Sequence, residues 1–278
     1  MPTGQGRAQP SLRRAGAARA SLPAADRLRA ATPALRFATY LAPGLRPLYE
    51  HVAAACGASS LVSGRDWREL ASGDIDAAFV CSPPLVWLEG AVEAIAAPVL
   101  TDDRFGDEPL YSSEVVVRAE SRFRSLADLA GARWAVNEPS SWSGYWVTLA
   151  RVGEWSYFGQ VVEAGSHHRA LRLVAEGAVD GSAIDCQVLA MELRQRPELA
   201  DRIRVVASLG PSPIQPVVVR SSLAAGLRSD LCERLLSLGG PVLEHHFVRR
   251  FVAPPSYAPV AAELSRRPRP GAPARSGA

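Results

Sequence analysis

The sequence predicts an α/β fold with mainly parallel sheets, and three observations support this prediction. Short apolar runs that are typical of strands alternate along the chain with helical patterns. The run 75–80 is apolar almost throughout, as expected of a strand that is covered on both faces. With 278 residues, 47% of them hydrophobic, the chain is also long enough for two lobes of ordinary domain size.

The first hundred residues contain four predicted strands, at 35–40, 61–62, 75–80 and 91–100. Two helices separate the first three strands, one that runs toward Ala55 and one over 67–71. Gly73 ends the second helix, because glycine readily adopts the left-handed backbone found at a helix C-terminus.

The next strand, 133–136, leads into a turn that is rich in serine. Pro139 stops this strand, and the apolar residues after Gly144 have a helical spacing, so we expect a helix from near Ser143. A helix start leaves backbone N–H groups unpaired and carries a partial positive charge. Hydroxyls at Ser141 and Ser143 therefore indicate capture of a small oxyanion, although a serine that only caps the helix gives the same pattern.

A second strand–turn–helix unit follows, again with polar residues at its turn. The apolar pair at 161–162 precedes the turn 165–167, and a helical pattern covers 170–175. Gly177 ends that helix, and the next strand is predicted at 181–184. The repetition favours the interpretation of both turns as parts of one ligand site.

Four segments of the chain stand in a characteristic order. They are 72–79 (SGDIDAAF), 111–118 with 125–131, 141–144 (SWSG), and 165–167 (GSH) with Asp180. In these segments the chain resembles the phosphonate and phosphite solute-binding proteins of ABC importers, over about residues 35–265. The resemblance implies a two-lobed type II periplasmic-binding-protein fold. Each lobe would be a mainly parallel sheet flanked by helices, and two crossover strands would form the hinge.

The resemblance also implies where the lobes begin and end. The chain would cross between them at 111–118 and at 204–219. The first lobe would then comprise 35–118 plus 205–265, and the second lobe 119–204. Residues 1–33 are rich in Ala, Arg and Pro and lack aromatics, so we expect a disordered tail, as we do for 266–278.

The serine turn is the expected anion loop. By the resemblance, Ser141 and Ser143 donate hydrogen bonds to ligand oxygens, and the N–H groups of Ser143 and Gly144 point at the same oxygens. Trp142 stands where the family commonly has threonine, so a ring that replaces a hydroxyl would reshape the cleft. His167 aligns with a ligand-contacting histidine, whose protonated imidazole would pair with a dianion. A surface histidine at a helix start is the alternative.

Three aromatic residues are further candidates for the cleft. Tyr111 matches an aromatic at the crossover that reaches the ligand in the family. Trp67 resembles another cleft aromatic, and Tyr40 lies at the end of the first predicted strand. For Trp67 and Tyr40, packing in the core is an equal alternative.

Uncharged residues occupy two positions that bear on specificity. Family members that bind an aminoalkyl phosphonate pair its ammonium with two carboxylates, and the matching positions here are Gln187 and Gln215. Asp185 lies close to the first position and is the candidate substitute. We therefore expect a ligand other than 2-aminoethylphosphonate.

Composition and motifs argue against several other classes. The net charge is only +3 and no helix has a basic face, so a nucleic-acid surface is not expected. No Gly-x-Ser-x-Gly elbow or His-Glu-x-x-His motif occurs. We therefore expect a protein without enzymatic activity that binds neither a metal ion nor an organic cofactor. The cysteines have no metal-site spacing, and whether any of them pair stays open: Cys56, Cys81, Cys186 and Cys232.

The expected function is that of a monomeric solute-binding protein of an ABC importer. It would capture a phosphonate, phosphite or phosphate-ester-like oxyanion, with sulfonates still open, and its partner by resemblance is an ABC permease. A cytoplasmic ligand sensor and an enzyme of pyrimidine-cofactor biosynthesis on the same fold are the alternatives. The family is extracytoplasmic, yet no apolar stretch of signal-peptide length follows the pair Arg13-Arg14, so the compartment stays open.

Overall fold

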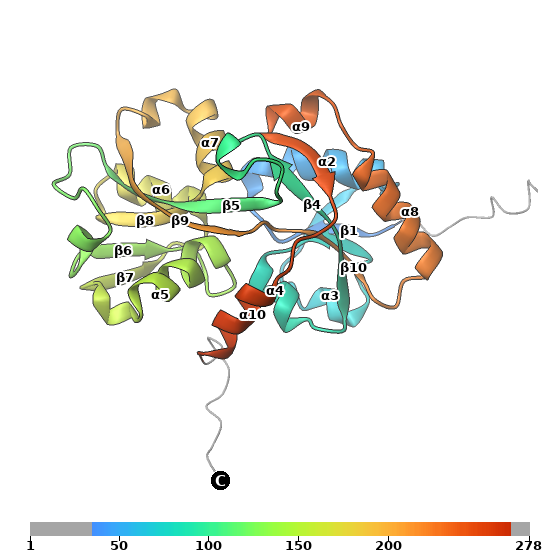
Figure 1. Cartoon of the computed structure of the whole chain (residues 1–278). Helices are drawn as coiled ribbons and strands as arrows, with labels where there is room; N and C mark the ends of the chain where they lie inside the picture. Colours follow the sequence, from blue (N-terminus) through green and yellow to red (C-terminus); the bar gives the residue numbers. More distant parts are fainter. Residues whose placement is uncertain (1–34, 268–278) are drawn as a thin grey trace, which may run out of the picture. The chain divides into compact units, whose positions relative to one another are not determined.

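The computed structural model describes residues 35–267, which form two β-sheets flanked by helices (Figure 1). Strands in the first sheet are β1 (Phe37–Thr39), β2 (Leu61–Ser63), β3 (Ala77–Phe79), β4 (Val92–Leu100), β10 (Val217–Arg220) and β11 (Val248–Val252), in the order β11-β4-β10-β3-β1-β2. The second sheet contains β5 (Leu110–Arg118), β6 (Arg133–Val136), β7 (Gln160–Glu163), β8 (Gly181–Asp185) and β9 (Ile203–Pro213), in the order β7-β6-β8-β5-β9. The predicted N-terminal tail lies outside the described residues.

The helices are α2 (Arg46–Ala55), α3 (Glu69–Ser72), α4 (Ser82–Trp87), α5 (Val147–Val152), α6 (His167–Ala175), α7 (Cys186–Gln195), α8 (Ala225–Leu236), α9 (Pro241–His245) and α10 (Ala258–Ser265). Gly73 ends α3 with φ of 82°, as its position in the sequence predicted. The helix predicted over 67–71 is shorter than expected, since the residues before Glu69 form a turn. Between residues 35 and 267, no helix combines the length and apolarity that crossing a bilayer requires.

Both sheets are mixed, with a parallel group of strands in each. Strands β2, β1 and β3 are mutually parallel, and so are β7, β6 and β8. The remaining neighbours, including β10 and β5, pair antiparallel. The carboxyl ends of a parallel group meet at one edge of its sheet, so each sheet brings its strand-end residues together there.

Alternating side chains of the strands fill cores on both faces of each sheet. Phe37 and Phe79 enter the core that also contains residues of α2 and α8, whereas Ala38 and Ala78 enter the core with Leu70 of α3. In the second sheet, α6 and α7 supply the core on one face, and residues of α5 belong to the core on the other. The alternation follows from the two-residue period of a strand.

The chain first passes between the sheets earlier than the sequence implied, whereas its second passage lies within the expected range 204–219. We expected 111–118 to belong with the first lobe, but β5 hydrogen-bonds with β8 on one side and β9 on the other. Its backbone groups are thus satisfied within the second sheet. By sheet membership, the two crossings lie at 101–109 and 214–216.

The C-terminal tail was predicted to begin at residue 266, but the first two residues of this tail are ordered. Arg266 and Arg267 both pair with Glu263, at 3.0 Å in each case. A second nitrogen of Arg267 donates to the carbonyl of Leu149 in α5 at 3.3 Å. These bonds extend the ordered chain to residue 267, and the rest of the predicted tail lies outside the described residues.

Candidate functional site

A cavity of about 340 Å³ opens between the two sheets. Residues at the carboxyl ends of parallel strands line it from both sides, namely Thr39, Ser63 and Phe79 from the first sheet and Asn137 and Asp185 from the second. Open α/β sheets bind their ligands at this edge, because loops and helix starts converge there. We refer to this cavity as the cleft.

Four helix starts reach the cleft. Arg46 is the first residue of α2, and His167 is the first residue of α6. Ser141 is the N-cap of a π-helical turn, Trp142–Trp146, that continues into α5, so this helix begins one residue before the predicted position. Asp185 is the N-cap of α7. Helix starts present N–H groups and a partial positive charge, which favours an anion in the cleft.

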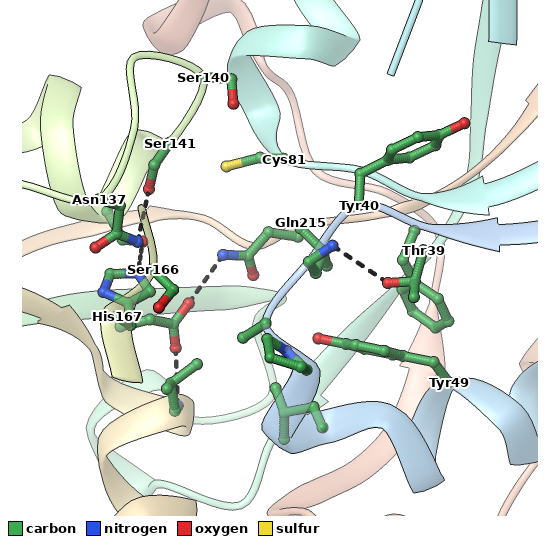
Figure 2. A pocket seen from close by; sticks show the side chains of 18 of the residues that line it. Thr39, Tyr40, Tyr49, Cys81, Asn137, Ser140, Ser141, Ser166, His167 and Gln215 are labelled. Carbon is green, nitrogen blue, oxygen red and sulfur yellow. Dashed lines mark hydrogen bonds between the residues drawn. The ribbon is translucent and has the colours of Figure 1, made fainter. Parts of the chain in front are cut away.

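The Ser141 hydroxyl is free to donate to a ligand. Its oxygen accepts the Gly144 N–H at 3.1 Å. It also accepts the Asn137 side-chain N–H at 3.4 Å (Figure 2). A serine oxygen has two lone pairs and one proton. Both lone pairs are occupied, so the proton remains for an acceptor in the cleft. Capping of the helix and contact with a ligand are therefore compatible at Ser141.

Ser143 and His167 form a buried pair. The Ser143 Oγ lies 2.7 Å from the His167 Nε2. The His167 Nδ1 faces the Ala183 carbonyl, short of a full hydrogen bond. A carbonyl is an acceptor, so it favours the proton on Nδ1 and leaves Nε2 to accept the Ser143 proton.

Burial lowers the pKa of His167 to about 3, although the Ala183 carbonyl partly raises it. The imidazole is thus neutral near pH 7 in the free protein. Burial disfavours the charged form, because transfer of the charge out of water costs more free energy than a hydrogen bond to one carbonyl provides. The predicted imidazolium concerns the complex with a dianion and stays a prediction.

Trp142 and Gly144 do not line the cleft, contrary to expectation. The Trp142 indole N–H donates to the Ser212 hydroxyl at 2.9 Å, and the ring is only 6% exposed. It therefore packs away from the cleft and does not reshape it. The Gly144 N–H is engaged by Ser141, so it cannot point at a ligand. A Cβ at Gly144 would lie 2.4 Å from the Asn137 side chain, which explains the glycine.

Tyr111 also lies outside the lining of the cleft. It is fully buried in β5, and its hydroxyl completes no hydrogen bond among residues 35–267. Burial raises its pKa, and the nearby Cys81 and Asp185 raise it further, whereas the Ser143 side chain lowers it. Tyr111 thus approaches Ser143 from the core and contacts no space that a ligand could enter.

Asp185 lines the cleft and is satisfied by uncharged donors. One carboxylate oxygen accepts the backbone N–H groups of Gln187 and Val188, at 2.9 and 3.2 Å, and the other accepts the Gln215 amide at 2.9 Å. No ion pair involves it in the described part of the chain. Burial raises the pKa of Asp185 to about 6, against these hydrogen bonds, which lower it.

Tyr40 and Trp67 both line the cleft and are also held by packing. The Tyr40 hydroxyl donates to Glu69 at 3.0 Å, and the Trp67 ring centroid lies 5.6 Å from that of Trp87. Both residues thus line the cleft and pack against the core, and their contact with a ligand stays a prediction.

Several lining residues were not among the predicted site residues. Asn137 is the most informative, because it is buried and its side-chain oxygen completes no hydrogen bond with residues 35–267. Its position directly after a predicted strand was the signal that could have identified it. Other lining residues that were not predicted include Thr39, Tyr49, Arg65, Cys81, Ser140 and Ser166.

The cysteines and the acidic residues suggest no metal site. Cys56, Cys81, Cys186 and Cys232 are all free. Within residues 35–267, no group of three or more His, Cys, Asp or Glu side chains is arranged to hold a metal ion. Cys81 lines the cleft, and its Sγ accepts the Trp142 backbone N–H at 3.3 Å.

Comparison with known proteins identifies one family. The sequence model for the periplasmic substrate-binding protein of phosphonate ABC transporters matches residues 67–254. A comparison with curated protein sequences finds no match.

Solved structures with the same fold come from several bacteria. A Prochlorococcus marinus protein in complex with methylphosphonate aligns with a TM-score of 0.70 at 17% identity, over 84% of this chain and 97% of its own. The binding-protein component of a phosphonate transporter from Pseudomonas aeruginosa aligns at 0.67 and 18% identity, over 80% and 81%. A Xanthomonas citri protein bound to chloride aligns at 0.65 and 20% identity, over 84% and 98%. These matches confirm the predicted two-lobed α/β fold.

Proposed function

Because the chain belongs to the family of periplasmic substrate-binding proteins of ABC phosphonate transporters, we propose that it captures a small oxyanion in the cleft and delivers it to an ABC permease. Proteins of this family are periplasmic and work with such a permease. The observation that carries the proposal is the free Ser141 proton at a helix start inside the cleft.

The anion is held by neutral donors in this proposal. Ser141 donates directly, and the start of α6 at His167 adds a partial positive charge. His167 and Ser143 contribute as a hydrogen-bonded pair, because the imidazole stays neutral. Buried donors of this kind suit a desolvated oxyanion, since each hydrogen bond to a charged group contributes about 1.5–3 kcal/mol.

Phosphonates, phosphite and phosphate esters are the proposed ligands, and sulfonates are weaker candidates. The amides of Gln187 and Gln215 occupy the positions that would pair an ammonium, and both already have partners. Asp185 is buried among three N–H donors. Neither amide carries a charge and the Asp185 carboxylate already has its partners, which disfavours the pairing of an aminoalkyl ammonium at these positions.

Binding rather than catalysis fits the Ser143–His167 pair. A separation of 2.7 Å suits a nucleophile and its base. A general base works best when its pKa lies near the operating pH, whereas burial lowers that of His167 to about 3. A proton taken from Ser143 would not be retained, so the pair supports a binding role.

A thermal-shift screen tests this function. Methylphosphonate, phosphite, phosphate and methanesulfonate would each be added to the purified protein over a concentration series. A ligand at 100 times its Kd stabilises the folded state by about 2.7 kcal/mol, which raises Tm by roughly 5–10 °C for a domain of this size. We expect at least one phosphorus oxyanion to give this shift, and the absence of a shift with all of them would contradict the proposal.

A further inference from the structure

The cleft has two unlike walls. Asn137, Ser141 and His167 present polar atoms from the second sheet, and Tyr40 and Tyr49 lie across the cleft from them (Figure 2). Further apolar side chains on the first-sheet wall are Leu41, Leu48, Trp67, Phe79, Pro84 and Pro98, and Arg46 and Arg65 also line this wall. A ligand that fills the cleft therefore meets hydrogen-bond donors at one end and rings at the other.

The ring of Tyr40 is fixed, and its hydroxyl is already engaged. A Cβ at Gly64 would lie 1.9 Å from the Tyr40 ring, so the ring packs directly on the glycine backbone. The hydroxyl donates to Glu69 at 3.0 Å. What Tyr40 offers to the cleft is consequently an apolar ring and no donor for the anion.

The ring of Trp67 is also held in place before any ligand arrives. The Trp87 ring lies 5.6 Å away, and the Arg68 guanidinium covers Trp67 at 4.6 Å. The Trp87 ring at the end of α4 in turn contacts the ring of Trp146, in the π-helical turn before α5, edge-on with 6.3 Å between the ring centroids. A ring fixed in this way binds a partner with little loss of side-chain freedom.

The volume of the cleft exceeds the need of a bare phosphonate. A water molecule occupies about 30 Å³ in the liquid, so a cavity of about 340 Å³ holds roughly eleven heavy atoms. Methylphosphonate has about five heavy atoms and would fill roughly half of it. The remaining volume suits a group about the size of a six-membered ring.

We infer that the ligand is an oxyanion with an uncharged ring or bulky apolar arm. This inference rests on the proposed function. The anionic head binds at Ser141 and His167, and the arm lies against Tyr40 and Trp67. The amides of Gln187 and Gln215 and the carboxylate of Asp185 already have hydrogen-bond partners, so they offer no further partner to a polar arm.

Calorimetric titration with phenylphosphonate and methylphosphonate tests the inference, because the two share one head group. We expect phenylphosphonate to bind at least about tenfold more tightly to the wild-type protein, as an aromatic contact with additional apolar burial predicts. The variant Trp67→Leu should bring the ratio of the two affinities toward one. Trp155→Leu is the matched control, since Trp155 packs on Tyr145 at 4.8 Å and does not line the cleft.

Two results would overturn the inference in distinguishable ways. Equal affinities of the wild-type protein for the two phosphonates would exclude the ring-binding wall and leave the proposed function intact. Failure of both phosphonates to bind would overturn the inference, and the proposed function would fall with it if phosphite and phosphate also give no shift in the thermal-shift screen. The wild-type comparison alone decides between these outcomes, even if Trp67→Leu does not fold.

Discussion

Asp185 should make the ligand-free protein less stable at neutral pH than at mildly acidic pH. Burial raises its pKa from 3.8 to about 6, so the folded state binds this proton more tightly than the unfolded chain does. Stability from this group is therefore greatest below pH 3.8 and declines as pH rises through about 6. The rise in the pKa of Asp185 from 3.8 to about 6 corresponds to roughly 3 kcal/mol of stability.

The substitution Asp185→Asn removes this penalty with little change of shape. Asparagine is a good N-cap, so it still accepts the N–H groups of Gln187 and Val188. Gln215 can rotate its amide to accept from the new side chain. The variant should match the wild type near pH 4 and exceed it by up to about 3 kcal/mol at pH 7.5, which is about 6–12 °C in Tm.

Urea denaturation of both proteins from pH 4 to 8 gives this difference directly. Asp76→Asn is the control of opposite sign. Burial raises the pKa of Asp76, but hydrogen bonds from Arg36 and Arg220 outweigh it and lower the pKa overall. That variant should be less stable than the wild type at pH 7.5, and the difference in stability should become smaller as pH falls. If Asp185→Asn runs parallel to the wild type at every pH, or is less stable at pH 7.5, the reasoning about Asp185 is wrong.

Four further predictions concern the serine turn and its partners. Ser141→Ala should weaken binding of the best screened oxyanion and also cost about 1 kcal/mol of stability by urea titration, because the cap of the helix is lost. Ser143→Ala should cost about 1–3 kcal/mol in the same titration, because the His167 Nε2 is left buried without its partner; an unchanged midpoint would refute the pairing. Gly144→Ala should destabilise the protein by about 1–3 kcal/mol through its clash with Asn137, and wild-type stability would show that the turn relaxes. Titrations in buffers of different ionisation enthalpy should show no His167-dependent proton uptake at pH 7, and uptake that disappears in His167→Ala would show that the ligand charges the imidazole.

The sequence predicted the elements that bring the site together. Periodicity located the strands β3, β6 and β8. Gly73 and Gly177 marked the C-terminal ends of the helices α3 and α6. Polar residues at the ends of parallel strands then had to meet at one edge. Ser141, Ser143, His167, Asp185, Tyr40 and Trp67 do line the cleft.

What the sequence missed depends on directions and environments that only the folded chain defines. Trp142 and Ser143 are neighbours in a helical turn, so one faces Ser212 and the other His167. No local pattern distinguishes which of the two enters the cleft. The charge state of His167 depends in the same way on burial by distant segments. The lobe boundary at β5 was missed because the strand is buried along most of its length, a pattern that suits a central strand of either sheet.

The most direct measurement is the position of phosphorus in a crystal of the complex with methylphosphonate, located by anomalous scattering. The account predicts that one phosphonate oxygen lies about 2.5–3.0 Å from the Ser141 Oγ, with the phosphorus close to His167. Phosphorus bound elsewhere, for example in the arginine-lined hollow at Arg118, Arg122 and Arg133, would contradict it.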